Sequence, residues 1–138
     1  MDQARRGDVP LRATTIANPT RAEREDTTMQ ANLSKRINQL LVLSVLRRGP
    51  GHGYQIALSV EEKTAGRFTF QHGTLYPILH RLEKRGLVRG EWDEGARRRK
   101  TYHLTREGRE ALREETARLR DEFGVLFALL EEAGDEAA

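Results

Sequence analysis

The 138-residue sequence contains no cysteine, so it offers neither a disulfide framework nor a thiolate for metal binding or nucleophilic catalysis. Aromatic residues make up only 6% of the chain, and the mean hydropathy is −0.71. No apolar run is long enough to cross a membrane, and the N-terminus lacks the basic start and apolar core of a secretory signal. These absences predict a water-soluble protein of the cytoplasm with one modest core.

The sequence also lacks the common signatures of catalysis and metal binding. Its four histidines show no HExxH or similar ligand spacing, and neither a Ser/His/Asp arrangement nor a phosphate-binding loop is present. His80 and Glu83 stand three residues apart and could together hold a metal, but a solvated pair is far commoner at that spacing. We therefore expect no enzyme activity, no metal and no cofactor.

Charge is abundant instead, and it is distributed unevenly along the chain. Residues 67–106 hold ten Lys or Arg against four Asp or Glu, whereas residues 107–138 hold four against ten. This asymmetry indicates a polyanionic partner at one surface and a different role for the acidic tail.

The first 33 residues carry two prolines and show no sustained hydrophobic period, which is typical of a disordered extension. Met29 stands just before the first periodic segment, so we hypothesise that translation starts there and that residues 1–28 are absent from the cell. The intact mass of the protein expressed from its native gene would test this hypothesis.

Hydrophobic periodicity predicts three helices between residues 34 and 86. Ser34 is a suitable N-cap for the first helix, and residues 53–63 form the second. The stretch "RFTF" at residues 67–70 alternates like a very short strand. The third helix starts near residues 72–74, because Pro77 is tolerated only in a first turn, and it ends at Gly86. Its apolar stripe consists of Leu75, Ile78, Leu79 and Leu82.

A β-hairpin follows, because "LVRGEW" and "RKTYHLT" alternate with period two on either side of the turn "DEGA". Four consecutive cationic residues lie at its tip and at the start of its returning strand: Arg97, Arg98, Arg99 and Lys100. DNA phosphates opposite these residues would offset their mutual repulsion. We expect Trp92 to pack under the hairpin and Tyr54 to lie in the core.

Three short helices and a hairpin, in this order, indicate a winged helix-turn-helix domain at residues 34–105, and the fold class is mainly α with a small β-hairpin. In such a domain the third helix reads bases in the major groove, while the hairpin, called the wing, contacts the DNA backbone. The expected DNA-binding residues on the helix are His72, Gly73, Thr74, Tyr76, Pro77, His80, Arg81 and Lys84, and those on the wing are the four cations of residues 97–100.

A last long helix is expected from Arg106 to about Ala133, with Thr105 as its cap. Its apolar residues recur at alternating spacings of four and three, the repeat of a seam between paired helices. Left in water, each large side chain would forgo about 1.5–3 kcal/mol of burial. We therefore expect residues 106–138 to form a dimerisation helix, whose seam includes Leu112, Leu119, Phe123, Leu126 and Leu130.

Over roughly residues 40–109 the motifs "HGYQI", "GTLYPILHRLEKRGLV" and "RRRKTYHLTREGR" together resemble the PadR family of bacterial transcriptional regulators. The resemblance implies a homodimeric repressor of the short form, with one C-terminal helix, in which Thr74, Tyr76 and Pro77 enter the major groove. Some short members bind flat aromatic compounds at the dimer centre. Here the last helix has no Trp, which disfavours that binding, although Phe123 and Phe127 leave room for a smaller pocket.

We expect a homodimeric repressor that binds an operator in double-stranded DNA and responds to a small-molecule effector of unknown identity. The alternative is a winged-helix module for protein–protein interaction, whose wing docks on an acidic partner. DNA binding weakens steeply with salt and prefers one duplex sequence, so these two properties distinguish the alternatives.

Overall fold

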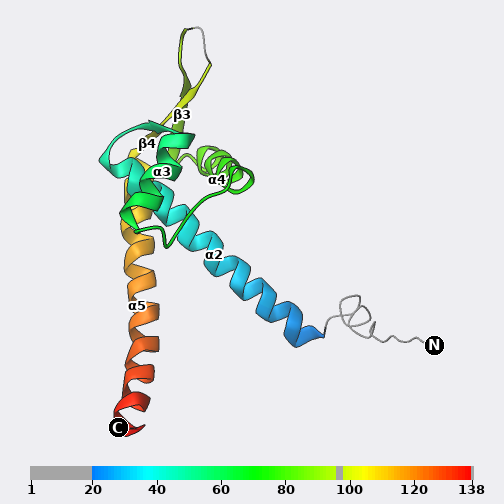
Figure 1. Cartoon of the computed structure of the whole chain (residues 1–138), viewed down its shortest axis with the longest axis vertical. Coiled ribbons are helices and arrows are strands. Elements are labelled where there is room, and N and C mark those ends of the chain that lie inside the picture. Colours follow the sequence, from blue (N-terminus) through cyan, green and yellow to red (C-terminus); the bar gives the residue numbers. More distant parts are fainter. Residues whose placement is uncertain (1–19, 96–97, 138) are drawn as a thin grey trace, which may run out of the picture. The chain divides into compact units, whose positions relative to one another are not determined.

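The computed structural model describes residues 20–95 and 98–137. The described elements are α2 (Arg21–Arg48), β2 (Gly51–His52), α3 (Gly53–Lys63), α4 (His72–Lys84), β3 (Val88–Trp92), β4 (Lys100–Leu104) and α5 (Arg106–Ala137) (Figure 1). The chain divides into two compact units after Arg36. Among the described residues, no helix combines the length and hydropathy that a membrane span needs.

The predicted start of the first helix at Ser34 is wrong, because α2 begins at Arg21 and residues 21–33 are helical rather than disordered. This stretch contains two each of the helix-forming residues Ala, Glu and Arg, and no Pro or Gly interrupts it. It continues a helix whose apolar residues lie further along, so it needs no apolar period of its own. Met29 lies within α2, and residues 1–19 fall outside the described part of the chain.

The core of the second unit is built from the apolar stripes of α2, α3 and α4 together with the base of the hairpin. The buried cluster consists of Val42, Leu43, Leu46, Ile56, Leu75, Ile78, Leu79, Leu82, Leu87, Val88, Tyr102 and Leu112. The stripe predicted for α4 is confirmed in full. Leu112 of α5 is only 5% exposed, so this residue, expected at a dimer seam, already packs inside its own chain.

Helix α4 ends as predicted at a left-handed glycine. Gly86 has φ +78°, a conformation that costs glycine little because it lacks a Cβ atom. Its amide donates to the carbonyl of Glu83 at 3.0 Å, and the amide of Leu87 donates to that of Leu82 at 2.9 Å. This pair of bonds is a Schellman motif, and it turns the chain directly from α4 into β3.

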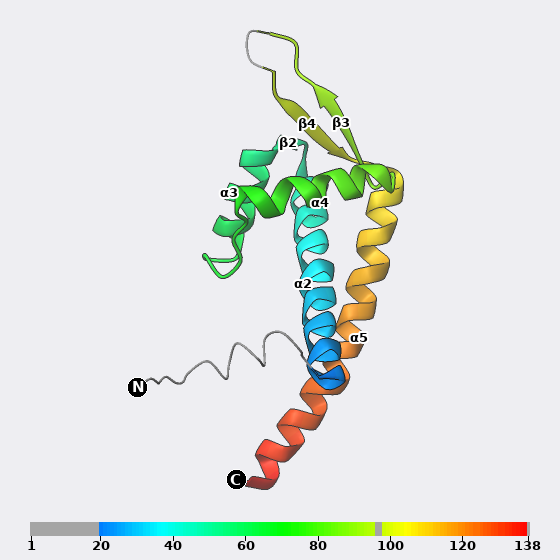
Figure 2. The same ribbon diagram turned by 90° about the vertical axis from the view of Figure 1, so that its right-hand side faces the viewer.

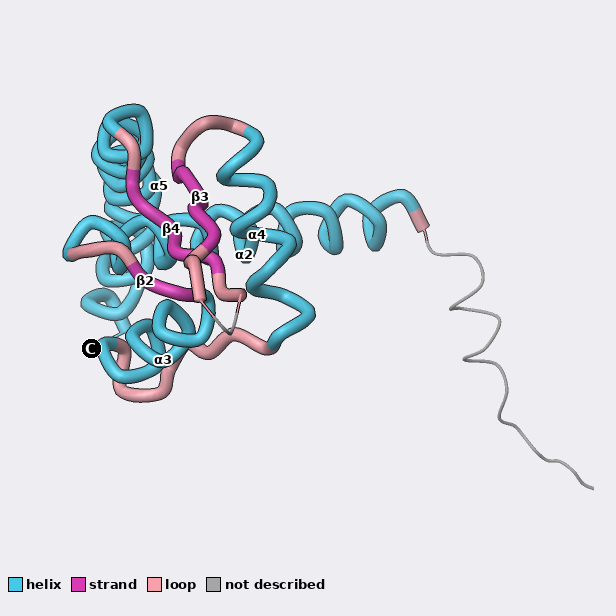
Figure 3. The backbone as a smooth tube through the Cα atoms, turned by 90° about the horizontal axis from the view of Figure 1, so that it is seen from above, coloured by secondary structure: helices cyan, strands magenta, loops and turns pink. Residues whose placement is uncertain are grey.

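The sheet has three antiparallel strands in the order β2-β4-β3 (Figure 3). The predicted hairpin is confirmed, with Val88 opposite Leu104 and Trp92 opposite Lys100. The two-residue strand β2 was not predicted, because two residues carry no period. "RFTF" forms no strand, and its Phe70 packs against the core instead.

The junction between β4 and α5 explains the motif "LTREGR". Thr105 Oγ1 accepts the amide of Gly108 at 3.0 Å, as an N-cap does, and its hydroxyl contacts the carbonyl of Gly86 at 2.7 Å. A Cβ atom on Gly108 would lie 2.1 Å from the carbonyl oxygen of Leu87. Only glycine therefore lets the first turn of α5 approach the α4–β3 connection this closely.

Candidate nucleic-acid interface

Helix α4 passes below the base of the hairpin and carries a polar face on the side away from the core (Figure 2). Most of the residues expected on that face are exposed: Gly73, Thr74, Tyr76, Pro77, His80 and Lys84. Arg81 is half-buried, and its Nε has no hydrogen-bond partner among the described residues. The side chain of His72 lies outside what the structure describes. A helix with one buried and one polar face can meet a DNA groove without opening the core.

Tyr76 lies against the N-terminal turn of α3. A Cβ atom on Gly53 would lie 2.7 Å from the Tyr76 hydroxyl oxygen, so glycine is needed for this packing. Tyr76 is nevertheless 47% exposed, which leaves one side of its ring to solvent. The glycine of the motif "HGYQI" thus positions a residue expected to contact DNA.

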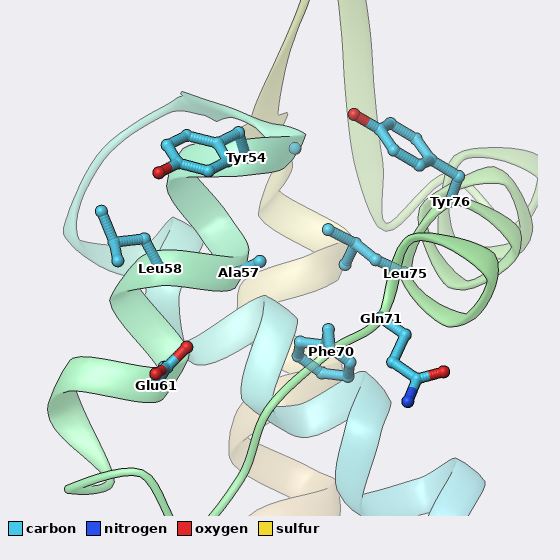
Figure 4. Close-up of a pocket in the computed structure, with 9 residues that line it drawn as sticks. Tyr54, Ala57, Leu58, Glu61, Phe70, Gln71, Leu75 and Tyr76 are labelled. Atoms are coloured by element: carbon cyan, nitrogen blue, oxygen red, sulfur yellow. The ribbon is translucent and has the colours of Figure 1, made fainter.

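Residues of α3 and α4, Tyr76 among them, line a small pocket of about 200 Å³. Figure 4 shows Tyr54 and Leu58 of α3 across from Leu75 and Tyr76 of α4. Tyr54 is 70% exposed, so the prediction that it lies in the core is wrong. The pocket is smaller than the roughly 300–1,000 Å³ of most ligand sites.

The wing consists of β3, β4 and the residues that connect them. Near its tip Arg98 and Arg99 are exposed, and neither forms an ion pair among the described residues. The Arg98 guanidinium lies 4.9 Å from the centre of the Trp92 ring, a cation–π contact. Trp92 is 56% exposed, so it supports an arginine at the surface instead of packing under the wing as predicted. Arg97 falls outside the described residues.

Lys100 differs from the two arginines because its charge is already paired. Its Nζ lies 2.9 Å from Oε1 of Glu83 on α4, and both side chains are largely shielded from solvent. The hydrogen bond to Glu83 raises the pKa of Lys100 above its ordinary value of 10.5. Burial likewise raises the pKa of the neighbouring Tyr102 above 10.0. Lys100 therefore stays charged, and its amine is paired with a carboxylate of α4.

A second set of polar contacts holds the base of the wing to β2. His52 Nε2 lies 3.5 Å from Oδ2 of Asp93, and the Thr101 hydroxyl donates to Oδ1 of the same carboxylate at 2.8 Å. The other ring nitrogen of His52 lies 3.3 Å from the carbonyl oxygen of Lys100. Sequence reasoning missed His52, Glu83 and Asp93, because nothing in their spacing indicates that the fold brings them to the wing.

Between α4, the start of α3 and the wing lies a hollow of about 480 Å³. Its lining includes the aromatic residues Tyr54, Tyr76 and Trp92 and the basic residues His80, Arg98, Arg99 and Lys100. Cations and exposed aromatic rings on one concave surface suit a nucleic acid, since phosphates attract the former and sugars or bases pack on the latter. The structure therefore brings Tyr76 and His80 of α4 together with the wing cations of residues 98–100. The other described residues expected on α4 do not line this hollow: Gly73, Thr74, Pro77, Arg81 and Lys84.

The far part of α5 has a different surface. Phe123 and Phe127 pack with their ring centres 6.0 Å apart, and the apolar side chains around them are exposed. The exposed residues are Val125, Leu126, Phe127, Leu129 and Leu130. They include residues outside the predicted seam, so the apolar surface is broader than one stripe.

No group of three or more His, Cys, Asp or Glu side chains suited to a metal occurs in the described ranges. Within residues 20–95 and 98–137, the hollow between α4 and the wing is cationic and aromatic, whereas the exposed surface of the far part of α5 is apolar.

Comparison with known sequences identifies the family to which this arrangement belongs. The sequence profile of the "Transcriptional regulator PadR-like family" matches residues 42–114. The chain is also 33% identical over 76 residues to "Transcriptional regulator YqjI" of Escherichia coli. That match covers 55% of this chain but only 36% of YqjI, so the chain spans about a third of this relative.

Solved structures show the same fold. A PadR family transcriptional regulator from Eggerthella lenta superposes with a TM-score of 0.63 at 35% identity, over 78% of this chain and 95% of that one. Bacillus subtilis PadR in complex with operator DNA superposes with a TM-score of 0.52 at 25% identity, over 56% of this chain and 45% of that one.

Proposed function

The chain belongs to the PadR-like family of transcriptional regulators, and from this membership we propose that it is a homodimeric repressor that binds a specific operator in the cytoplasm. The observation that carries the proposal is the shared hollow between α4 and the wing, where free arginines and a polar helix face meet. A structural relative, Bacillus subtilis PadR, has been solved with operator DNA.

In the proposed complex α4 enters the major groove, and Thr74, Tyr76 and His80 face the base edges. Arg98 and Arg99, together with Arg97, contact phosphates in this proposal, and the two described arginines, Arg98 and Arg99, are exposed and form no ion pair with described residues. Lys84 at the end of α4 adds a further phosphate contact. Base edges therefore determine which sequence is bound, while the wing contributes affinity that does not depend on sequence.

The proposed dimer forms through the far part of α5. Its exposed apolar side chains would gain about 1.5–3 kcal/mol each on full burial, and a second copy offers the same surface in return. Phe123, Leu126 and Leu130 lie at the centre of this contact, with Leu119 beside them. Two copies place two α4 helices on two half-sites, as operator symmetry requires.

A small-molecule effector belongs to the proposal as well. The hollow of about 480 Å³ lies within the size range of ligand sites, and a molecule bound there would occupy the space that DNA needs.

The test is a fluorescence-anisotropy titration of the purified chain on duplex DNA from upstream of its own gene, with a scrambled duplex as control, at two salt concentrations. We expect tighter binding to the native duplex and a steep loss of affinity with salt. Equal and weak binding to both duplexes would contradict binding at its own promoter and would favour a wing that docks on an acidic protein.

A further inference from the structure

Lys100 differs from Arg98 and Arg99 of the wing because its charge is paired with a carboxylate from another element. Its Nζ is 2.9 Å from Glu83 and lies over the rings of Trp92 and Tyr102, at 5.4 and 5.7 Å from their centres. Glu83 belongs to α4, and Lys100 begins the returning strand of the wing. The contact therefore joins the proposed reading helix to the proposed phosphate-binding hairpin.

Gly90 provides the space for this contact. A Cβ atom at this position would lie 2.4 Å from Cε of Lys100 and 3.0 Å from Oε2 of Glu83. Gly90 stands on β3, so the lysine side chain crosses the neighbouring strand to reach α4. The Lys100 side chain thus passes over Gly90, and its amine lies near two aromatic rings and a carboxylate.

The pair is shielded enough to hold its geometry. The exposed fractions of the Lys100 and Glu83 side chains are 24% and 32%, whereas both members of the Arg89–Glu91 pair on the outer wing are more than half exposed. Shielded pairs are less screened by salt than exposed pairs are. At the ionic strengths used for DNA binding, the link between α4 and the wing therefore persists.

We propose that the Glu83–Lys100 pair sets the angle between the wing and α4, and that Lys100 is a positioning residue for operator recognition and not a phosphate contact. The inference rests on the proposed function. A specific complex needs α4 in the groove and the wing on the backbone at once, and a fixed angle removes the cost of ordering the wing on binding. Non-specific binding needs only positive charge within reach of phosphates.

The charge of Glu83 makes the test decisive. Glu83→Gln removes a negative charge, so simple electrostatics predicts tighter binding to every duplex. The positioning role predicts the opposite for the operator alone: about tenfold weaker binding, equivalent to about 1.4 kcal/mol, with binding to a scrambled duplex equal or tighter. Gly90→Ala changes no charge, and we expect it to act like Glu83→Gln.

Trp92, the only tryptophan, reports on the wing without any DNA. In time-resolved fluorescence anisotropy of the free protein, we expect Glu83→Gln and Gly90→Ala to increase the nanosecond motion of Trp92. The exchanged pair Glu83→Lys with Lys100→Glu should restore part of the wild-type decay. Lys63→Met, at the end of α3, serves as the control and should leave the decay unchanged.

The DNA arm uses a 30-base-pair duplex that the wild-type chain selects from a randomised pool, and a scrambled duplex of the same composition. Lys100→Met should weaken binding to the selected duplex and leave the salt dependence of scrambled binding unchanged. Equal weakening on both duplexes, with a smaller salt dependence, would make Lys100 a phosphate contact and would overturn the proposal. An unchanged Trp92 decay in Glu83→Gln would overturn it as well.

Failure of the two proposals can be told apart. If the wild-type chain selects no duplex at all, the DNA-binding function fails, while the Trp92 decay still decides whether the pair fixes the wing. Thermal unfolding of each variant is measured in parallel. Because Glu83→Gln and Gly90→Ala alter the contact in different ways, a folding defect in one leaves the other to decide.

Discussion

The wing and α5 both extend from the same core, but they meet the solvent with opposite chemistry. Ion pairs and hydrogen bonds join the wing to α4 and β2, and Arg98 and Arg99 near its tip are exposed and form no ion pair among the described residues. The far part of α5 exposes apolar side chains, with Val125 76% exposed. The wing therefore suits an anionic partner, and α5 suits an apolar one.

The wing and the far part of α5 can therefore be altered independently. Thr105 and Gly108 anchor the start of α5 at the α4–β3 connection, so each extension begins at a fixed point of the core. A change far out on either extension leaves that junction intact. We expect variants of the wing to lose DNA binding but remain dimeric, and we expect variants of α5 to become monomeric.

The largest effect is expected when the charge of the wing is reversed. Arg98→Glu with Arg99→Glu removes two charged contacts and places two anions against phosphates. We expect at least about a 100-fold loss of affinity for the native duplex, since each charged contact contributes about 1.5–3 kcal/mol. Anisotropy titration measures the affinity, and sedimentation velocity should show an unchanged dimer.

The matched control is Arg118→Glu with Arg120→Glu, which makes the same change in charge on α5. If this control lost as much affinity as the wing variant, the effect would be one of net charge. If the wing variant became monomeric, the wing and α5 would not be independent of each other.

The second largest effect concerns α5. Phe123→Asp or Leu119→Asp places a carboxylate in the proposed dimer contact, and we expect about a 100-fold weaker dimer, from the lost burial of one large side chain and the cost of desolvating the charge. The resulting monomers should bind a half-site poorly. Sedimentation velocity over a range of concentrations measures the dimer.

Arg118→Asp, on the exposed charged side of α5, is the control and should remain dimeric. Val125→Asp measures how broad the dimer contact is, because Val125 lies outside the predicted seam. A dimer that survives this change has a narrow contact, and one that dissociates buries α5 on more than one side. An unchanged sedimentation profile for both seam variants would refute the proposed contact.

How far the sequence predicts the fold depends on whether a feature is local. The helices α3 and α4, the hairpin and the cap at Thr105 follow from spacing and turn residues, and the structure confirms them. The start of α2 was mistaken, because residues 21–33 carry helix-forming residues without an apolar period. The strand β2 was missed, because two residues are too few for a pattern.

The exposure of most residues expected at the candidate interface could be predicted from the sequence, but the contacts that join α4 to the wing could not. The exposed face of α4 and the exposed arginines follow from periodicity and charge. Glu83 and Lys100 are 17 residues apart, and the turn at Gly86 and the hairpin pairing of β3 with β4 together bring them into contact. The predictions for Trp92 and Tyr54 were wrong because they assumed that aromatic side chains are buried. Both side chains are exposed, and Arg98 lies over the ring of Trp92.

A smaller effect separates the wing arginines from its lysine. Each phosphate contact releases counterions, so Arg99→Gln should reduce the slope of log affinity against log salt by about 0.9. Lys100→Gln should leave that slope unchanged, because Lys100 is paired with Glu83. Anisotropy titrations at four salt concentrations on the scrambled duplex measure both slopes. Equal slopes for the two variants would place both cations on phosphates.

The smallest effect is the pH dependence of stability at the base of the wing. The pKa of Lys100 is raised by its hydrogen bond to Glu83, so in the unfolded chain this amine loses its proton at lower pH than in the fold. The pKa of Tyr102 is raised by burial, so the unfolded phenol also ionises first. For both groups the folded state holds more protons above about pH 10, and stability must fall as the pH rises.

We therefore expect the free energy of unfolding to decline as the pH rises above about 10, by less than about 1 kcal/mol for the partly exposed lysine. Urea unfolding between pH 8 and 11 measures it. Tyr102→Phe removes the contribution of the phenol, and Lys100→Met removes that of the amine, so each variant should show a shallower decline. The double variant Arg98→Gln with Arg99→Gln changes only the exposed side of the wing and should follow the wild-type curve. If the wild-type decline persisted unchanged in both single variants, the alkaline sensitivity would arise outside the wing. The contacts of Lys100 and Tyr102 would then not distinguish the wing from α5.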